Sequence, residues 1–139
     1  MSSIFDMRIG CERSSFRYIA VTYGLINSTW TLPLIVGWPI AKELLFTGRV
    51  IKAEEALRIG LLNKLVPSPE LLHSAIEMGK EIAANDTGTV QVIKDIMNRH
   101  IGMSLREMML NELETISQSL PTPNPEKNFR NFLERSGDK

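Results

Sequence analysis

After Pro67, apolar residues recur every three or four positions, which is the spacing of one helix face. A serine, a proline and a glutamate at residues 68–70 give a start signal for a first helix, which extends through Asn85. A second helix is expected over residues 89–101, with Gly102 as its stop. The apolar positions of these two predicted helices are Leu72, Ala75, Ile76, Gly79, Ile82, Ala83, Val92, Ile93, Ile96 and Met97.

A third helix begins at a capping box, in which Ser104 and Glu107 have the spacing for reciprocal hydrogen bonds. Its expected apolar stripe consists of Leu105, Met108, Met109, Leu113, Ile116 and Leu120. The methionines there, with Met97 and Met103, are expected to fill a core more often than to form a binding surface. A last helix is predicted over residues 126–135, so the whole C-terminal region is expected to be helical.

In the first 67 residues, the stretches of regularly spaced apolar positions are shorter, and helix-like and strand-like stretches are mixed. Ser28 or Thr29 can cap a helix, and Gly48 and Gly60 stand where left-handed residues would end two others. Ala56, Leu57 and Ile59 are expected to face inward on the last of these helices. The predicted segments are helices over 30–36, 41–46 and 53–59, a buried strand over 18–21, a strand-like connector at 50–51 and a short buried strand over 61–66.

Composition narrows the classes of function. The chain has 139 residues, of which 43% are hydrophobic, and this suffices for one domain with a core. The formal net charge is zero, so no nucleic-acid or acidic-membrane partner is expected. No apolar run approaches the roughly 20 residues of a membrane span, and no signal peptide is recognised. The protein is therefore expected to be soluble and cytoplasmic, or in an organelle matrix if a longer precursor exists.

Cysteine and histidine usage does not indicate a metal or redox site. The single cysteine, Cys11, excludes an intramolecular disulfide and is expected to be a packed small residue near a turn. His73 and His100 fall on different predicted helices and have no carboxylate or thiol at metal-ligand spacing. Both histidines are expected at the surface, and no metal site is predicted.

Short motifs recur between residues 24 and 67. They are Gly24-Leu25-Ile26, Leu32-Pro33, Val36-Gly37, Glu43-Leu44-Leu45, Thr47-Gly48-Arg49, Ala53-Glu54-Glu55-Ala56, Ile59-Gly60-Leu61, Asn63 and Val66-Pro67. Their order and spacing resemble the crotonase superfamily, the enoyl-CoA hydratases and isomerases. Residues 6–10 and 12–16 resemble the strand, turn and strand that precede this block in the family.

The resemblance covers about residues 6–135 and corresponds to the C-terminal half of a family member. It implies the α/β crotonase fold, here as a mostly helical fragment with two or three short strands. Residues 1–67 would be the C-terminal part of the crotonase core with the loop that flanks the active site. Residues 68–139 would be the helical region that relatives use for oligomerisation and for covering CoA.

The implied active-site positions include two substitutions. Family hydratases have a proline and a glutamate at the positions where this chain has Ile19 and Ala20. Alanine cannot transfer a proton, so no catalytic residue is assigned. Ile19 and Ala20 are kept as substrate-binding candidates, while a proton-relay role for Tyr18 or Tyr23 is the less favoured alternative to a buried strand.

Three further substrate-binding candidates come from the loop at residues 27–31, which replaces a glycine-rich loop of the family. Asn27 and Ser28 would lie beside the acyl group. Trp30 is either a lid over the acyl pocket or, as the favoured alternative, a core residue.

The predicted C-terminal helix supplies the last two candidates. In many relatives this helix packs over the CoA site, and the resemblance nominates Phe132 for contact and Arg135 for a phosphate. The alternative is a solvated helix with an ordinary surface arginine.

The resemblance implies a protein that acts on acyl-CoA thioesters through an oxyanion-stabilised enolate. It implies no metal or organic cofactor, because CoA belongs to the substrate, and it implies a homo-oligomer, a trimer in relatives. The family's oxyanion donors belong to the N-terminal half, so the isolated chain is expected to lack activity. The alternative of another class is a non-catalytic helical module for oligomerisation or acyl-CoA binding.

Overall fold

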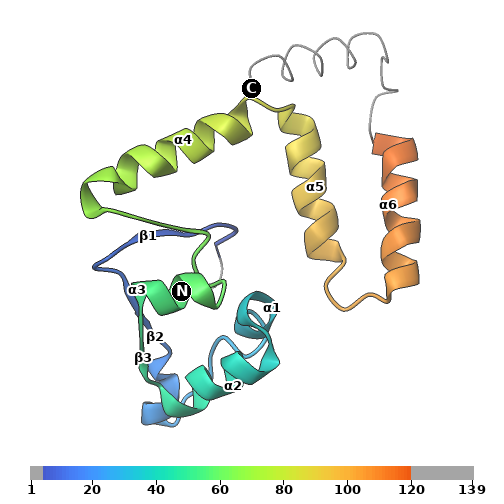
Figure 1. Cartoon of the computed structure of the whole chain (residues 1–139). Helices are drawn as coiled ribbons and strands as arrows, with labels where there is room; N and C mark the ends of the chain where they lie inside the picture. Colours follow the sequence, from blue (N-terminus) through green and yellow to red (C-terminus); the bar gives the residue numbers. More distant parts are fainter. Residues whose placement is uncertain (1–4, 120–139) are drawn as a thin grey trace. The chain divides into compact units, whose positions relative to one another are not determined.

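The computed structural model describes residues 5–119 (Figure 1). Contacts divide the chain into two compact units, Met1–Glu81 and Ile82–Lys139. The division falls inside helix α4 (Leu71–Ala83). The sequence-based division at residue 67 was made on functional grounds and stays a prediction.

Two pairs of short strands organise the first unit. β1 (Ile9–Cys11) pairs in parallel with β4 (Lys64–Val66), and β2 (Ser15–Arg17) pairs antiparallel with β3 (Val50–Lys52). The strand predicted at residues 50–51 is therefore confirmed, whereas the buried strand predicted over 61–66 is shorter, Lys64–Val66, and only Val66 in it is buried. Cys11 is buried beside the turn that separates β1 from β2, as expected.

The segment after β2 corrects one prediction. Residues 18–21 are not a strand, because Ile19–Tyr23 forms a turn of 3-10 helix, η2. The Thr22 hydroxyl donates to the carbonyl oxygen of Ile19 at 2.8 Å, and Gly24 ends the turn with a left-handed backbone at φ 67°. This side-chain bond and this glycine favour a local turn over the predicted extended strand.

Two helices follow η2. α1 (Leu32–Val36) begins at Thr31, which makes no side-chain cap bond, so the predicted cap at residues 28–29 is wrong. α2 (Trp38–Thr47) ends at Gly48, whose left-handed backbone has φ 58°. The glycine stop of α2 is confirmed, because a β-carbon would disfavour this conformation.

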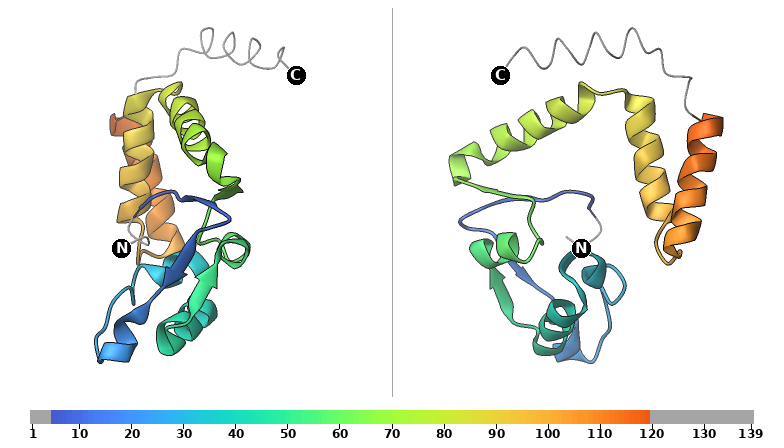
Figure 2. Two further views of the ribbon diagram at one scale, coloured as in Figure 1. Left: turned by 90° about the vertical axis from the view of Figure 1, so that its left-hand side faces the viewer. Right: turned by 45° about the vertical axis from the view of Figure 1, so that its right-hand side comes forward.

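The core of the first unit lies where α1, α2 and α3 (Ala53–Arg58) meet the β2–β3 pair. Figure 2 shows these elements close together in both views. Leu57 is 41% exposed, so its predicted inward position is wrong, whereas Ala56 is fully buried. The buried core cluster consists of Tyr18, Leu32, Val36, Ala41, Leu44, Ile51, Ala56, Leu61 and Leu62.

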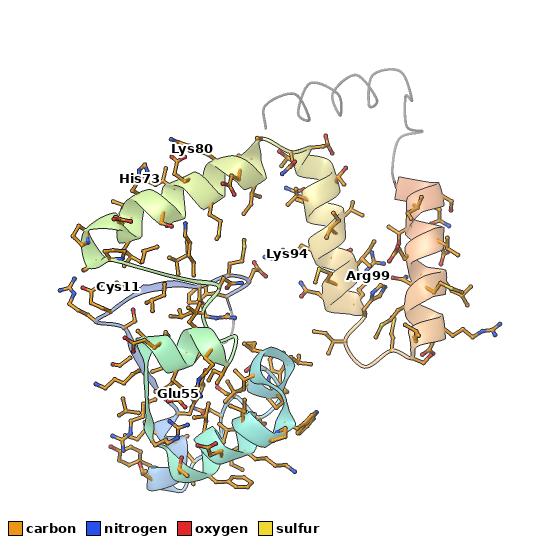
Figure 3. The ribbon with its side chains drawn as sticks, in the orientation of Figure 1. Cys11, Glu55, His73, Lys80, Lys94 and Arg99 are labelled. Carbon is orange, nitrogen blue, oxygen red and sulfur yellow. The ribbon has the colours of Figure 1, made fainter. Side chains whose placement is uncertain are left out.

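Arg49, which directly precedes β3, hydrogen-bonds Glu43 on α2 and Glu55 on α3, and this group of three residues is called the arginine fork. Arg49 donates from Nη1 and Nη2 to the two carboxylate oxygens of Glu55 at 2.8 and 2.6 Å, and from Nε to Glu43 at 2.8 Å. Figure 3 labels Glu55 on α3. The bidentate geometry fixes the angle between the two groups as well as their separation. Hydrogen bonds from Arg49 hold the pKa of Glu55 below its usual value of 4.5.

This pair is expected to make folding stability sensitive to acid. The pKa of Glu55 is lower in the folded chain than in the unfolded chain, so its contribution is present above about pH 4.5 and is lost as pH falls through the folded value. Glu55→Gln should therefore reduce the loss of unfolding free energy between neutral and acid pH, measured by urea denaturation. Glu54→Gln, an exposed neighbour on the same helix, is the control and should leave the acid dependence unchanged.

Residues 68–83 begin differently from the prediction. Ser68–Glu70 is a 3-10 turn, η3, and α4 starts after it at Leu71. Leu72 is 72% exposed and Ile76 is 47% exposed, whereas Ser74 is buried. The apolar positions of α4 are thus partly open to solvent in this chain.

The second unit contains a helical hairpin of α5 (Thr87–Arg99) and α6 (Leu105–Ser119), which lie side by side. α5 begins two residues earlier than predicted, because Asp86 caps it by accepting from the Thr89 N–H at 2.7 Å. The predicted capping box at the start of α6 is confirmed. Ser104 N–H donates to Glu107 Oε2 at 2.7 Å, and the serine hydroxyl accepts from the glutamate N–H.

Large apolar side chains of the hairpin are exposed in the described part of the chain. Met97 is 67% exposed and Met109 is 56% exposed, so the expectation that they fill a core is wrong. His73 is exposed as predicted, but His100 is half-buried and its Nε2 atom is enclosed. The other exposed apolar residues of the hairpin and its turn are Ile93, Ile101, Leu105, Leu110, Leu113 and Ile116.

Candidate functional site

A hollow of about 290 Å³ opens in the first unit between η2, the loop after it and α2. It contains two of the sequence-predicted site residues, Ala20 and Asn27. The residues that line it are Tyr18, Ala20, Val21, Leu25, Ile26, Asn27, Thr29, Leu45 and Phe46.

The backbone around the hollow is held by short hydrogen bonds. The N–H of Leu25 donates to the carbonyl oxygen of Ala20 at 3.0 Å, which folds the loop back on η2. The N–H of Leu32 donates to the carbonyl oxygen of Ser28 at 3.1 Å, and Ser28 has a left-handed backbone with φ 53°. A non-glycine residue in this conformation is uncommon and often marks a functional loop.

Among residues 5–119, no Asp, Glu, His, Lys or Arg side chain lines this hollow. Its exposed polar side chains are the amide of Asn27 and the hydroxyl of Thr29, whereas the phenol oxygen of Tyr18 is itself enclosed. A site of this composition binds an apolar group through burial and orients it through a few hydrogen bonds. It offers no carboxylate or imidazole to activate water.

The remaining predicted residues lie around the hollow without lining it. Ile19 is half-buried at the start of η2, and Ser28 is half-buried in the loop. Trp30 is 68% exposed, so the interpretation of Trp30 as a core residue is wrong. Phe132 and Arg135 lie outside the described residues, and their roles stay predictions.

Sequence reasoning missed the contribution of α2. Leu45 and Phe46 line the hollow, and Phe46 is 71% exposed. No sequence signal marks Phe46, because single apolar residues are common on protein surfaces.

A second hollow, of about 320 Å³, lies beside the arginine fork and is lined by Ile40, Glu43, Arg49, Glu55, Arg58 and Ile59. The charges of Arg49 and Glu55 already satisfy each other there. Within residues 5–119, no group of three or more metal-ligating side chains is assembled, and no helix is long and apolar enough to cross a membrane.

Residues 1–138 match the sequence model of a protein family, which is described as enoyl-CoA hydratase/isomerase. The chain belongs to this family. Membership confirms the resemblance to the crotonase superfamily that the motifs indicated.

Two curated relatives show the extent of the match. The chain is 32% identical to the short-chain-enoyl-CoA hydratase of Clostridium acetobutylicum over 133 residues, which cover 94% of this chain and 51% of the relative. It is 31% identical to the crotonyl-CoA hydratase of Syntrophomonas wolfei, again with 94% and 51% coverage. The chain thus spans about half the length of the curated relatives it matches.

Solved structures support the fold. The crystal structure of enoyl-CoA hydratase from Bacillus anthracis superimposes with a TM-score of 0.85 at 29% identity, covering 96% of this chain and 53% of that one. The predicted crotonase fold, mostly helical with short strands, is therefore confirmed for this half of an enoyl-CoA hydratase/isomerase.

Proposed function

We propose that this enoyl-CoA hydratase/isomerase family chain binds acyl-CoA thioesters, with the acyl chain in the hollow beside Ala20. The observation that carries this proposal is the largely apolar lining of that hollow, which comes from η2, the following loop and α2. Family membership supports the thioester as the ligand class. CoA arrives as part of the substrate, and the proposal includes no metal or organic cofactor.

The proposed reaction is the family's acyl-CoA chemistry through an oxyanion-stabilised enolate, and the chain alone is proposed to bind without hydrating. The side chain of Ala20 cannot hold or move a proton, and the rest of the lining has no carboxylate. The acyl group is proposed to be bordered by Ile19 on η2 and by Ser28 and Trp30 in the loop after it. Phe132 and Arg135 are proposed to contact CoA, with the guanidinium on a phosphate.

A titration of butyryl-CoA into the full chain, followed by calorimetry, tests this function. Ile26→Asp should weaken binding about tenfold or more, because it places a charge in the apolar lining at a residue that is 85% exposed in the free chain. Leu72→Asp is the matched control, because Leu72 is 72% exposed on α4 and does not line the hollow. Arg135→Ala should weaken binding most at low salt, since exposed charge contacts are screened.

If Ile26→Asp and Leu72→Asp weaken the binding of butyryl-CoA equally, the ligand does not bind in the hollow. The absence of any butyryl-CoA binding by the wild-type chain would overturn the proposed function.

We further propose that the chain forms a homo-oligomer, and a trimer is the state that the resemblance implies. The exposed apolar side chains of α5 and α6 support association, because contiguous patches of this kind mark interfaces. Sedimentation equilibrium at micromolar concentration should give a mass above that of one 15.7 kDa chain. A monodisperse monomer would contradict this prediction.

A further inference from the structure

Within the described part of the chain, strand β1 has a hydrogen-bonded neighbour on one edge only. That neighbour is β4, and the two strands run in parallel as a sheet of their own. Parallel strands belong, as a rule, to larger sheets that are covered on both faces. Two strands alone also seldom form a stable unit. The outer edge of β1 is therefore a place where a further strand is expected.

The hydrogen bonds around β1 show which of its backbone groups face outward. The N–H and the carbonyl oxygen of Arg8 both bond Asn63, which precedes β4. The N–H of Cys11 instead donates to Ser14 Oγ at 3.0 Å, and its carbonyl oxygen accepts from the Ser14 N–H at 2.8 Å. Backbone groups alternate in direction along a strand, so those of Ile9 point to the same side as those of Cys11. Ser14 closes the outer edge at Cys11 and leaves it open at Ile9.

The charged side chains on either side of β1 are turned toward β4. Arg8 Nε donates to the carbonyl oxygen of Leu61 at 2.6 Å, and Glu12 Oε2 accepts from the Ser68 N–H at 2.9 Å. Leu61 and Ser68 flank β4 in the chain, and the strand β1 itself carries no charge. The outer edge of β1 thus lacks the charged residues with which edge strands commonly prevent further pairing.

The strand β4, in contrast, has such protection. Lys64 is exposed on this strand, and Pro67, which follows it, has no N–H to donate. The residues that lead into β1 include Phe5 and Met7, which are apolar and are 62% and 47% exposed. An open and uncharged strand edge beside exposed apolar side chains is suited to binding by strand addition.

We propose that the outer edge of β1 binds, by strand addition, a separate polypeptide that carries the N-terminal half of an enoyl-CoA hydratase/isomerase fold. The chain covers 51% of the clostridial relative and 53% of the Bacillus structure, so about half of the fold comes from residues outside the match. β1 is the first strand of the described chain, so in the family order it follows that remaining half. An apolar strand suits an uncharged edge of a parallel sheet. The inference concerns the fold and does not depend on the proposed acyl-CoA ligand.

Co-expression tests this inference. The half of the Clostridium acetobutylicum hydratase that this chain does not match is produced with an affinity tag, together with the full chain of 139 residues. The chain should be recovered with the tagged half, and light scattering should give the mass of a one-to-one complex. The inference is overturned if the chain is not recovered with the tagged half, or if the chain forms complexes only with its own copies.

A substitution at Ile9 tests the edge itself. Ile9→Pro should lower the amount of recovered chain about tenfold or more, because it removes the outward N–H donor and its ring obstructs a neighbouring strand. Pairing with β4 should persist, since proline is tolerated where the N–H of an edge strand faces outward. Ile9→Val keeps the N–H and a β-branched side chain, so this matched control should bind like wild type. Equal recovery of wild type and Ile9→Pro would overturn the assignment of this edge.

Urea denaturation of the chain alone establishes whether Ile9→Pro folds. If it does not, Met7→Lys replaces it, because Met7 precedes β1 and is 47% exposed. Met7→Lys should also lower recovery about tenfold, since the added polypeptide would bury a charge. Leu57→Lys is its matched control, at a residue that is 41% exposed on α3. Equal recovery of Met7→Lys and Leu57→Lys would overturn the inference.

Discussion

Purified chain is expected to show no hydration of crotonyl-CoA above background, since loss of a positioned general base alone typically costs roughly 10²–10⁴ in rate. The reason is Ala20, which the resemblance places where family hydratases have a glutamate and whose methyl group cannot transfer a proton. The lining of the hollow supplies no substitute carboxylate. The measurement is the loss of conjugated thioester absorbance, with the clostridial enzyme assayed in parallel.

The control for this measurement is a mock purification from host cells without the gene, because trace host hydratase would imitate activity. Turnover above the mock purification that persists after a change of expression host would contradict the prediction. It would indicate that another group transfers the proton, and Tyr18 and Tyr23 would be the first residues to substitute.

Leu44→Ala is expected to lower the free energy of unfolding by roughly 2–5 kcal/mol, the range for a fully buried leucine. Leu44 is completely enclosed in the core cluster, where α2 packs on its neighbours. The loss combines the transfer of apolar surface with the cavity that remains. Urea denaturation followed by circular dichroism measures it.

Leu72→Ala supplies the comparison, because Leu72 is 72% exposed and its truncation should change stability little. Equal effects of the two substitutions would show that the core of the first unit does not determine the stability of the chain.

Local signals in the sequence predicted much of the secondary structure. Gly48 ends α2 in a left-handed conformation, and the capping box of Ser104 and Glu107 opens α6, as expected. Both signals act through backbone hydrogen bonds within a few residues, so their outcome depends little on distant packing. Residues 18–21 were predicted wrongly as a strand, because the prediction did not include the side-chain bond of Thr22 to the carbonyl oxygen of Ile19.

Tertiary burial was less predictable than helix position. Helical spacing correctly placed α5 and α6, but Met97 and Met109 are exposed although the pattern suggested a core. Periodicity identifies which residues share a face and does not identify what covers that face.

The candidate site was predictable in part. Motif alignment led to Ala20 and Asn27, and both line the hollow. Phe46 was missed because the contact between α2 and the loop after η2 forms between segments that are distant in sequence. The unpaired oxygen of Tyr18 could not be foreseen, since a missing hydrogen bond depends on every neighbouring atom.

The parallel pairing of β1 with β4 has a consequence for the order of events during synthesis. Arg8 and Asn63, which hydrogen-bond at the edge of this pair, are 55 positions apart. At roughly 5–20 residues per second, β1 leaves the ribosome several seconds before its partner strand. The backbone hydrogen bonds of α5 and α6 join residues close in sequence, so these helices can form as they leave the ribosome. β1, in contrast, stays unpaired until β4 is synthesised, and a chaperone or another nascent chain can bind it during that time.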